Sequence, residues 1–183
     1  MKILGISFGT KNGNNDTMCK VALKGAKEAG AEVEFIQMSS INIKHCTGCC
    51  ACVKTLLSGK GSMCVLKDDF EWLLDKMKDA DGIVVSDPIF EEGASGLFHT
   101  IMDRFGPRAD RGNNIIGTKV AEAIGGKIPD SRMLNDKVIS FMGIGGSDWG
   151  TRVQCEHAML ALIPMWKVID NAWFPWAKEL VMD

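Results

Sequence analysis

Short, continuously apolar segments alternate with amphipathic stretches along this chain. Gly82–Ser86 and Val138–Met142 are largely apolar, as strands are when helices cover both faces of a parallel sheet. Between them, a helix is predicted from about Asp69 to Asp79, because its apolar residues recur at i, i+3, i+4 and i+7. This alternation of strand and helix predicts an α/β fold built on a doubly wound parallel sheet.

The other expected elements continue the same order. A strand at 1–6 precedes a helix from about Met18 to Gly30, and the next strand covers 33–38. A helix capped by Ser95 should end at Gly106 and Pro107. The last two elements are a helix at about 151–163 and a strand at 166–169. Segment 107–136 reads as a surface excursion, within which one helix is indicated at about 114–124.

Length and charge limit the possible functions. The chain has 183 residues, which suits one domain spanning 1–183, and its net charge of −2 comes without a basic run. Nucleic-acid and membrane-surface partners are therefore disfavoured, and small-molecule chemistry is favoured. The longest apolar stretch, Ala158–Trp166, is about half a membrane span and contains Pro164. We expect a soluble, cytoplasmic protein.

The polar loop Ser7–Thr17 joins the first strand to the first helix. Its hydroxyls, amides and two glycines, Gly9 and Gly13, would let backbone N–H groups and the positive helix end face an anion. The glycine spacing matches neither a Walker loop nor a dinucleotide fingerprint. The loop is therefore either a phosphate cradle of another kind or a polar turn in which Asn15 or Asp16 caps the helix.

Two further loops are expected at the same sheet edge. In such sheets ligands bind beyond the carboxyl ends of the strands, where the first loop should meet Asp87–Gly96 and Gly143–Gly150. Glycines let the backbone approach a flat ring, and Phe90 and Trp149 offer surfaces that pack beside one. A phosphate at one end and a planar group at the other indicate a mononucleotide-sized cofactor.

These loops resemble, in the same order, those of a known family. Ser7–Thr17 is similar to the G-S-P-R-x-x-G-N-T phosphate loop of NADPH-dependent FMN reductases. The stretch Pro88–Arg104 resembles their P-V-Y…K-x-x-x-D-R segment, and Gly143–Gly146 resembles their third loop. The resemblance implies a flavodoxin-like sheet of strand order 2-1-3-4-5 and bound FMN. The implied cofactor-binding residues are Ser7, Thr10, Lys11, Asn12, Asn14, Thr17, Pro88, Ile89, Phe90, Glu91, Gly93, Ser95, Gly145, Gly146 and Trp149.

The sequence departs from the family pattern in its first two loops. The Pro-Arg pair of the phosphate loop is missing, which leaves the phosphate charge to Lys11, hydroxyls and backbone. Asn15 and Asp16 intervene before Thr17. Phe90 replaces the common tyrosine and has no phenol hydroxyl to donate a hydrogen bond.

A cysteine-rich segment at 45–67 resembles the iron-sulfur flavoprotein branch of this family. The likeness lies in Cys46-x2-Cys49-x2-Cys52…Cys64, followed by Lys67-Asp68-Asp69. It implies FMN, a [4Fe-4S] cluster, and a homodimer or homotetramer with the flavin near subunit contacts. The implied cluster ligands are Cys46, Cys49, Cys52 and Cys64.

The spacing of the thiols, considered without the resemblance, also favours iron over zinc. Tandem C-x2-C-x2-C suits an iron-sulfur cluster, whereas structural zinc more often uses two separated C-x2-C knuckles. Eleven residues, 53–63, separate Cys52 from Cys64, and Gly59 and Gly61 would let that loop fold back. Cys50 is surplus. Zinc, a thiol redox pair and unligated cysteines remain the alternatives.

The expected function is that of an FMN-dependent oxidoreductase. It would pass electrons from a reduced donor such as NAD(P)H through FMN to a [4Fe-4S] cluster or to another small-molecule or protein acceptor. Because the flavin carries the chemistry, no side chain is assigned as catalytic. The alternatives are a cluster-free FMN or quinone reductase and a non-enzymatic electron carrier. Asp103–Arg104 is interpreted as a structural pair at a helix end, and His99 and His157 as structural.

Overall fold

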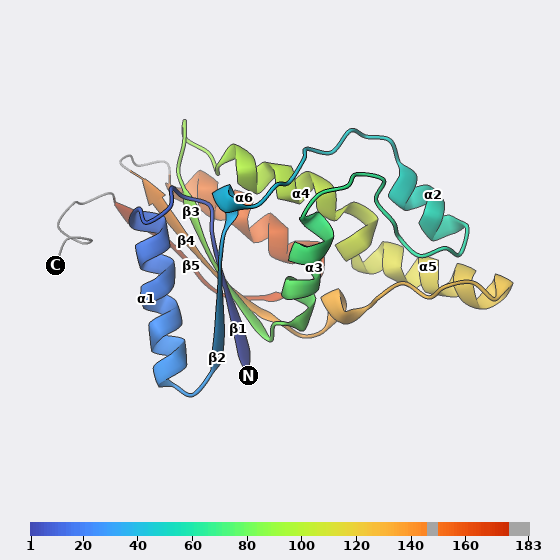
Figure 1. Cartoon of the computed structure of the whole chain (residues 1–183), viewed down its shortest axis with the longest axis horizontal. Coiled ribbons are helices and arrows are strands. Elements are labelled where there is room, and N and C mark those ends of the chain that lie inside the picture. The colour runs from blue at the N-terminus through green and yellow to red at the C-terminus, as the bar shows by residue number, and fades with distance from the viewer. Residues whose placement is uncertain (146–149, 176–183) are drawn as a thin grey trace.

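A five-stranded parallel sheet with helices on both faces forms the framework in our computed structural model, which describes residues 1–145 and 150–175 (Figure 1). The strand order β2-β1-β3-β4-β5 confirms the flavodoxin-like topology predicted from the sequence. All neighbouring strands pair in parallel, so their carboxyl ends lie along one edge. The strands are β1 (Lys2–Ser7), β2 (Glu32–Gln37), β3 (Gly82–Pro88), β4 (Val138–Gly145) and β5 (Lys167–Pro175).

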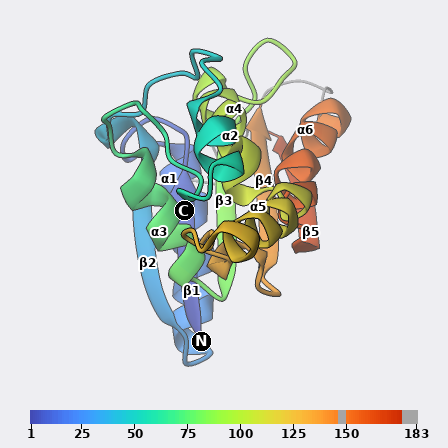
Figure 2. The same cartoon turned by 90° about the vertical axis from the view of Figure 1, so that its right-hand side faces the viewer.

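The helices cover the two faces unequally. Figure 1 shows α1 on one face of the sheet and α3, α4 and α6 on the other. Turning the molecule brings α2 and α5 to the front and places α1 behind the sheet (Figure 2). The helices are α1 (Asn14–Glu28), α2 (Ala51–Leu57), α3 (Phe70–Asp79), α4 (Gly96–Ala109), α5 (Arg111–Ile124) and α6 (Gly150–Leu162), with short 3-10 turns at Met38–Ser40 and Arg132–Leu134.

The larger core lies on the face that α3, α4 and α6 cover. Its fully buried aromatic rings come from two of these helices and from β4, and they are Phe70, Phe98, Phe105 and Phe141. Burying such a ring contributes roughly 2–3 kcal/mol. A smaller core of Ile3, Leu23 and Ala31 lies beneath α1. The sheet is therefore anchored from both sides, and its carboxyl edge is held in place for the loops.

Several boundaries differ from those predicted. Helix α1 begins at Asn14, four residues before the predicted start at Met18. The backbone of α4 breaks at Gly106 (φ 33°, ψ −135°), as the Gly-Pro pair predicted, but the chain then makes a further helical turn to Ala109. Helix α2, inside the cysteine segment, was not predicted.

The segment 107–136 contains the whole of α5 and packs against the cysteine segment. Gly117 of α5 lies directly against Leu56 of α2, where a β-carbon would collide with the leucine side chain. Helix α5 ends at Gly125, which is in the left-handed conformation (φ 66°).

Among the described residues, none of the helices is both long enough and apolar enough to cross a bilayer.

Candidate functional site

A cavity of about 360 Å³ opens where the carboxyl ends of β1, β3 and β4 meet. All three predicted loops contribute to it: Gly9, Thr10 and residues 13–15 from the first, Pro88–Phe90 from the second and Gly145 from the third. Its volume lies within the range of small-molecule sites, about 300–1,000 Å³. The convergence of the three loops is thus observed in the structure.

The first loop is shaped by a buried carboxylate. The Ser7 hydroxyl donates to Oδ1 of Asp16 at 2.5 Å, and the backbone N–H of Asn12 donates to its Oδ2 at 2.7 Å. Both Ser7 and Asp16 are buried. Asn12 takes a positive φ of 58°, which the asparagine tolerates better than most residues. Asp16 therefore holds the loop in its curve from inside.

The start of α1 corrects two sequence expectations. Neither Asn15 nor Asp16 is the cap: Gly13 occupies that position, and both polar residues lie in the first helical turn. Both therefore lie within α1 rather than in the loop that precedes it. The buried Asn15 amide donates to the Ser86 hydroxyl at 3.1 Å and so ties α1 to β3. Thr17 donates its hydroxyl back to Gly13 O at 3.1 Å, within the same helix.

Gln37, at the end of β2, was not singled out in the sequence. Its Nε2 donates to the carbonyl of Gly9 at 2.7 Å, and the Phe8 N–H donates to the Ser86 carbonyl at 2.8 Å. The phosphate-type loop is therefore fixed to both neighbours of β1. A lone glutamine at a strand end carries no recognisable signal without the fold.

The second loop makes a tight turn beside the cavity. Phe90 and Gly93 pair through reciprocal backbone hydrogen bonds of 3.0 Å, with Glu91 (φ 44°) and Glu92 (φ 68°) between them in left-handed conformations. Such conformations cost non-glycine residues about 1 kcal/mol or more each. The turn leaves the Phe90 ring 62% exposed at the cavity rim.

Two neighbouring residues of α6 secure this turn. The Glu156 carboxylate accepts the Ala94 N–H at 2.7 Å, while His157 Nε2 lies 3.2 Å from Oδ2 of Asp87. The same Asp87 oxygen accepts the Ser95 N–H at 3.0 Å, and the Ser95 hydroxyl in turn caps α4 by accepting the Phe98 N–H, as predicted. Hydrogen bonds to Asp87, before the strained turn, and to Ala94 and Ser95, after it, therefore fix the turn in place.

The predicted cofactor-binding residues fall into three groups, and whether each contacts FMN stays a prediction. Those that line the cavity are Thr10, Asn14, Pro88, Ile89, Phe90 and Gly145, together with four residues the prediction omitted, Gly9, Gly13, Asn15 and Ile144. Those that lie in or next to the loops without lining the cavity are Ser7, Lys11, Asn12, Thr17, Glu91, Gly93 and Ser95. Gly146 and Trp149 lie outside the described residues.

The cavity fits FMN by its chemistry. The N-terminal turn of α1 presents backbone N–H groups and the positive end of the helix dipole, which suit a phosphate. Ile89 and Phe90 offer apolar surface for a flat ring system. Gly145 approaches so closely that a β-carbon on it would lie 2.6 Å from Cβ of Ile89, so only glycine leaves the second loop in place.

The cysteine segment forms a second cavity, of about 170 Å³. It shares no lining residue with the first. Cys50, in a left-handed conformation (φ 55°), turns the chain into α2. The cavity brings together five thiols from the segment, namely Cys46, Cys49, Cys50, Cys52 and Cys64.

Arg104 connects this cavity to the rest of the protein. Its guanidinium donates to both oxygens of Asp68, at 2.7 and 3.1 Å, and to Sγ of Cys64 at 3.5 Å. The predicted pair of Asp103 with Arg104 is therefore wrong, because the arginine turns inward to Asp68. Burial alone would raise the pKa of Asp68, but hydrogen bonds from Arg104 and from the backbone of Lys44 and Phe70 lower it to about 2.

The cavity holds enough thiols for a four-cysteine cluster, but the described side chains are not arranged around a common metal position. Within 1–145 and 150–175, no three His, Cys, Asp or Glu side chains stand where they could jointly hold a metal ion. Hydrogen bonds from the Ala51 backbone and the Thr47 side chain lower the pKa of Cys49, which favours its thiolate. Burial raises the pKa of Cys52.

Comparison with known proteins agrees with the resemblance seen in the loops. The model of a family described as NADPH-dependent FMN reductase matches residues 1–179. An iron-sulfur flavoprotein of Methanocaldococcus jannaschii is 33% identical over 172 residues, which are 93% of this chain and 77% of that protein. One of Methanosarcina thermophila is 32% identical over 57% of this chain and 52% of its own.

Solved structures include a flavone reductase that is 63% identical and superposes with a TM-score of 0.84. It covers all of this chain, but this chain spans only 56% of it. RosB, solved with a bound riboflavin-phosphate derivative, shows the same fold at 17% identity and a TM-score of 0.64, over 96% of this chain and 64% of its own.

Proposed function

Because this chain belongs to the NADPH-dependent FMN reductase family, we propose that it binds FMN in the strand-end cavity and reduces an acceptor with electrons from NAD(P)H. The observation that carries the proposal is the meeting of three loops around one cavity of about 360 Å³. When bound, FMN supplies the ring that accepts a hydride and passes electrons on.

The roles of the protein's own residues follow from their positions. The phosphate would be held by backbone N–H groups of the first loop and of the start of α1, apart from those of Asn12 and Gly13, which already donate to Asp16 and Thr10. Ile89, Gly145 and, at the rim, Phe90 would line the side of the cavity that holds the ring. Asp16, Asp87 and Glu156 position the loops.

Two acceptors are supported by separate observations. The identity of 63% to a flavone reductase favours direct reduction of a planar aromatic ketone of the flavone type. In that reaction the nicotinamide gives up a hydride, a proton comes from solvent, and the acceptor gains two electrons and two protons. The cavity lined by five thiols, with an iron-sulfur flavoprotein as a relative, favours transfer to a [4Fe-4S] cluster held by Cys46, Cys49, Cys52 and Cys64.

An experiment on anaerobically purified protein tests the proposal. Flavin released by heat should be FMN, at one molecule per chain, and NAD(P)H should be consumed when flavone or a quinone is added. A protein that takes up no FMN on reconstitution would refute the proposal. Iron and acid-labile sulfide assays then separate the acceptors, since four irons per chain support the cluster and iron-free protein that still turns over flavone supports the direct reaction.

A further inference from the structure

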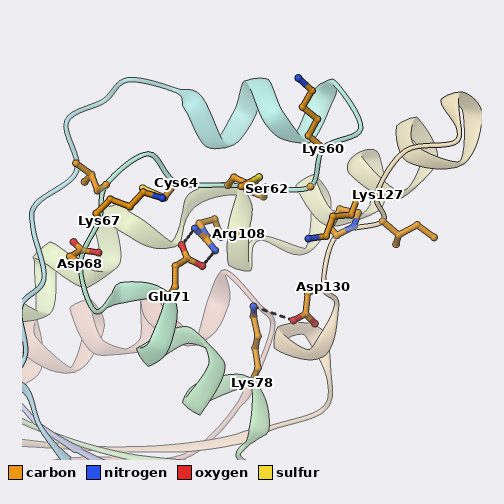
Figure 3. Close-up of a pocket in the computed structure, with 15 residues that line it drawn as sticks. Lys60, Ser62, Cys64, Lys67, Asp68, Glu71, Lys78, Arg108, Lys127 and Asp130 are labelled. Carbon is orange, nitrogen blue, oxygen red and sulfur yellow. Dashed lines mark hydrogen bonds and ion pairs between the residues drawn. The ribbon is translucent and has the colours of Figure 1, made fainter.

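A third cavity, of about 500 Å³, lies beside the cysteine segment and is independent of the strand-end cavity. Its walls come from the link between α2 and α3, from α3 itself, from the end of α4 and from the segment 127–130 (Figure 3). It shares no lining residue with the strand-end cavity. The nearby helices α2 and α5 lie in front of the sheet in Figure 2, and α1 lies behind it.

The lining of this cavity carries a surplus of positive charge. It contains five cationic and three acidic side chains. Each acid already has a basic partner: Asp68 pairs with Arg104, Glu71 with Arg108, and Asp130 with Lys78 at 3.2 Å. The surplus stands out because the whole chain has a net charge of −2.

Three of the lysines that line the cavity have no acidic partner among the described residues. Lys60, Lys67 and Lys127 form no ion pair with any residue that the structure describes, and all three line the cavity. Figure 3 shows the Lys127 ammonium directed toward the other lining side chains, whereas the Lys60 side chain extends away from them. The backbone segments that carry the two lysines are joined, because the Lys127 N–H donates to the Gly59 carbonyl at 2.6 Å. Of these two lysines, only Lys127 is therefore placed to meet an anion inside the cavity.

Two of the cationic side chains that line the cavity are largely buried. The side chains of Arg108 and Lys78 are only 8% and 9% exposed, and both line the cavity. The buried Nε of Arg108 has no hydrogen-bond partner among the described residues. Each is already paired with an acid, Arg108 with Glu71 and Lys78 with Asp130, so the charge that remains for an anion comes from the lysines that have no acidic partner in the described part of the chain. Apolar side chains, Met63, Leu66 and Ile128, complete the lining.

We propose that this cavity binds a small phosphate-bearing anion of up to nucleotide size through Lys67 and Lys127. Its concave shape and volume suit a small molecule rather than the surface of an acidic protein. The apolar side chains give a base or another flat group a place to pack. Because most residues of the Lys60–Lys67 link line this cavity, a bound anion also holds that link in place.

The test uses full-length protein saturated with FMN, so that the strand-end cavity is closed to the probes. Isothermal titration calorimetry with ADP and, separately, with inorganic pyrophosphate should detect binding that weakens as salt is added. The Lys67→Ala/Lys127→Ala variant should bind at least about tenfold more weakly. Tighter binding of ADP than of pyrophosphate identifies a nucleotide site, and equal binding identifies the phosphates as the only group recognised.

A matched control removes the same charge elsewhere. Lys27→Ala/Lys119→Ala alters two exposed lysines that do not line the cavity and should bind both probes like the unaltered protein. All variants should retain FMN, which shows that they are folded. The proposal is overturned if neither probe binds at millimolar concentration, or if the two double variants bind equally well.

Discussion

Nε2 of His157 and Oδ2 of Asp87 lie 3.2 Å apart behind the strand-end cavity, and both side chains are completely buried. The imidazole is stacked on Phe141, with ring centroids 5.2 Å apart, and meets the edge of Phe98. A polar pair enclosed by aromatic rings is costly to break, because the remaining partner stays buried without compensation.

Asp87→Ala should therefore destabilise the fold. The substitution leaves both His157 and the Ser95 N–H without their acceptor, so we expect a loss of about 3 kcal/mol in the free energy of unfolding. Urea denaturation measures it. Asp136→Ala, which removes a carboxylate that is 78% exposed, should cost less than about 1 kcal/mol. Equal losses in the two variants would show that the buried pair contributes nothing.

Gly145→Ala should weaken FMN binding. The added methyl group would lie 2.6 Å from Cβ of Ile89, so the second loop must move away from the cavity. Forced repacking of this kind costs about 1–3 kcal/mol, which corresponds to a roughly five- to hundredfold rise in the FMN dissociation constant. Quenching of FMN fluorescence measures it. Gly96→Ala, where the methyl group meets nothing within 4 Å, should bind FMN normally.

The Asp68–Arg104 pair should make stability depend on pH in acid. The pKa of Asp68 is about 2 in the folded protein, below its usual value near 3.8, so its contribution is complete above about pH 4 and is lost as the pH falls through 2. The shift corresponds to about 2 kcal/mol. In Asp68→Asn, this part of the pH dependence should disappear. Denaturation at pH 7, 4 and 2.5 would contradict the assignment if both proteins lost stability in parallel.

Cys49→Ala should abolish iron binding and leave FMN bound, if the thiol cavity holds a cluster. Cys49 lines the thiol cavity and none of the strand-end cavity, so only the first site loses a ligand. Iron and flavin content of anaerobically purified protein are the measurements. Cys155→Ala removes an exposed thiol of α6 and should leave both unchanged. Full iron content in Cys49→Ala would remove Cys49 from the ligand set.

The sequence predicted a doubly wound parallel sheet because buried parallel strands and amphipathic helices leave strong local patterns, whereas the strand order came from the family resemblance. The run Gly82–Ser86 and the stripe on α3 are examples. The start of α1 was missed because Asn14–Thr17 are polar and show no apolar periodicity. They are helical because tertiary contacts such as Asn15 with Ser86 hold them there.

Residues that act through long-range contacts escaped prediction for the same reason. Gln37 and Glu156 support the first and second loops from other elements, 28 and 62 positions away from their partners Gly9 and Ala94. Arg104 was assigned to its neighbour Asp103, although its partner Asp68 lies 36 positions away. Local spacing indicates which loops meet, but the residues that hold them depend on packing across the core.

The strand-end and thiol cavities have no lining residue in common. Mutations that reshape one therefore need not disturb the other, and the two can evolve at different rates. A lineage could abandon its thiols, or rearrange them around a different centre, while inheriting an intact flavin pocket. The proteins similar to this chain include one named for an iron-sulfur centre and one named for flavone reduction, which is consistent with two cavities that vary independently.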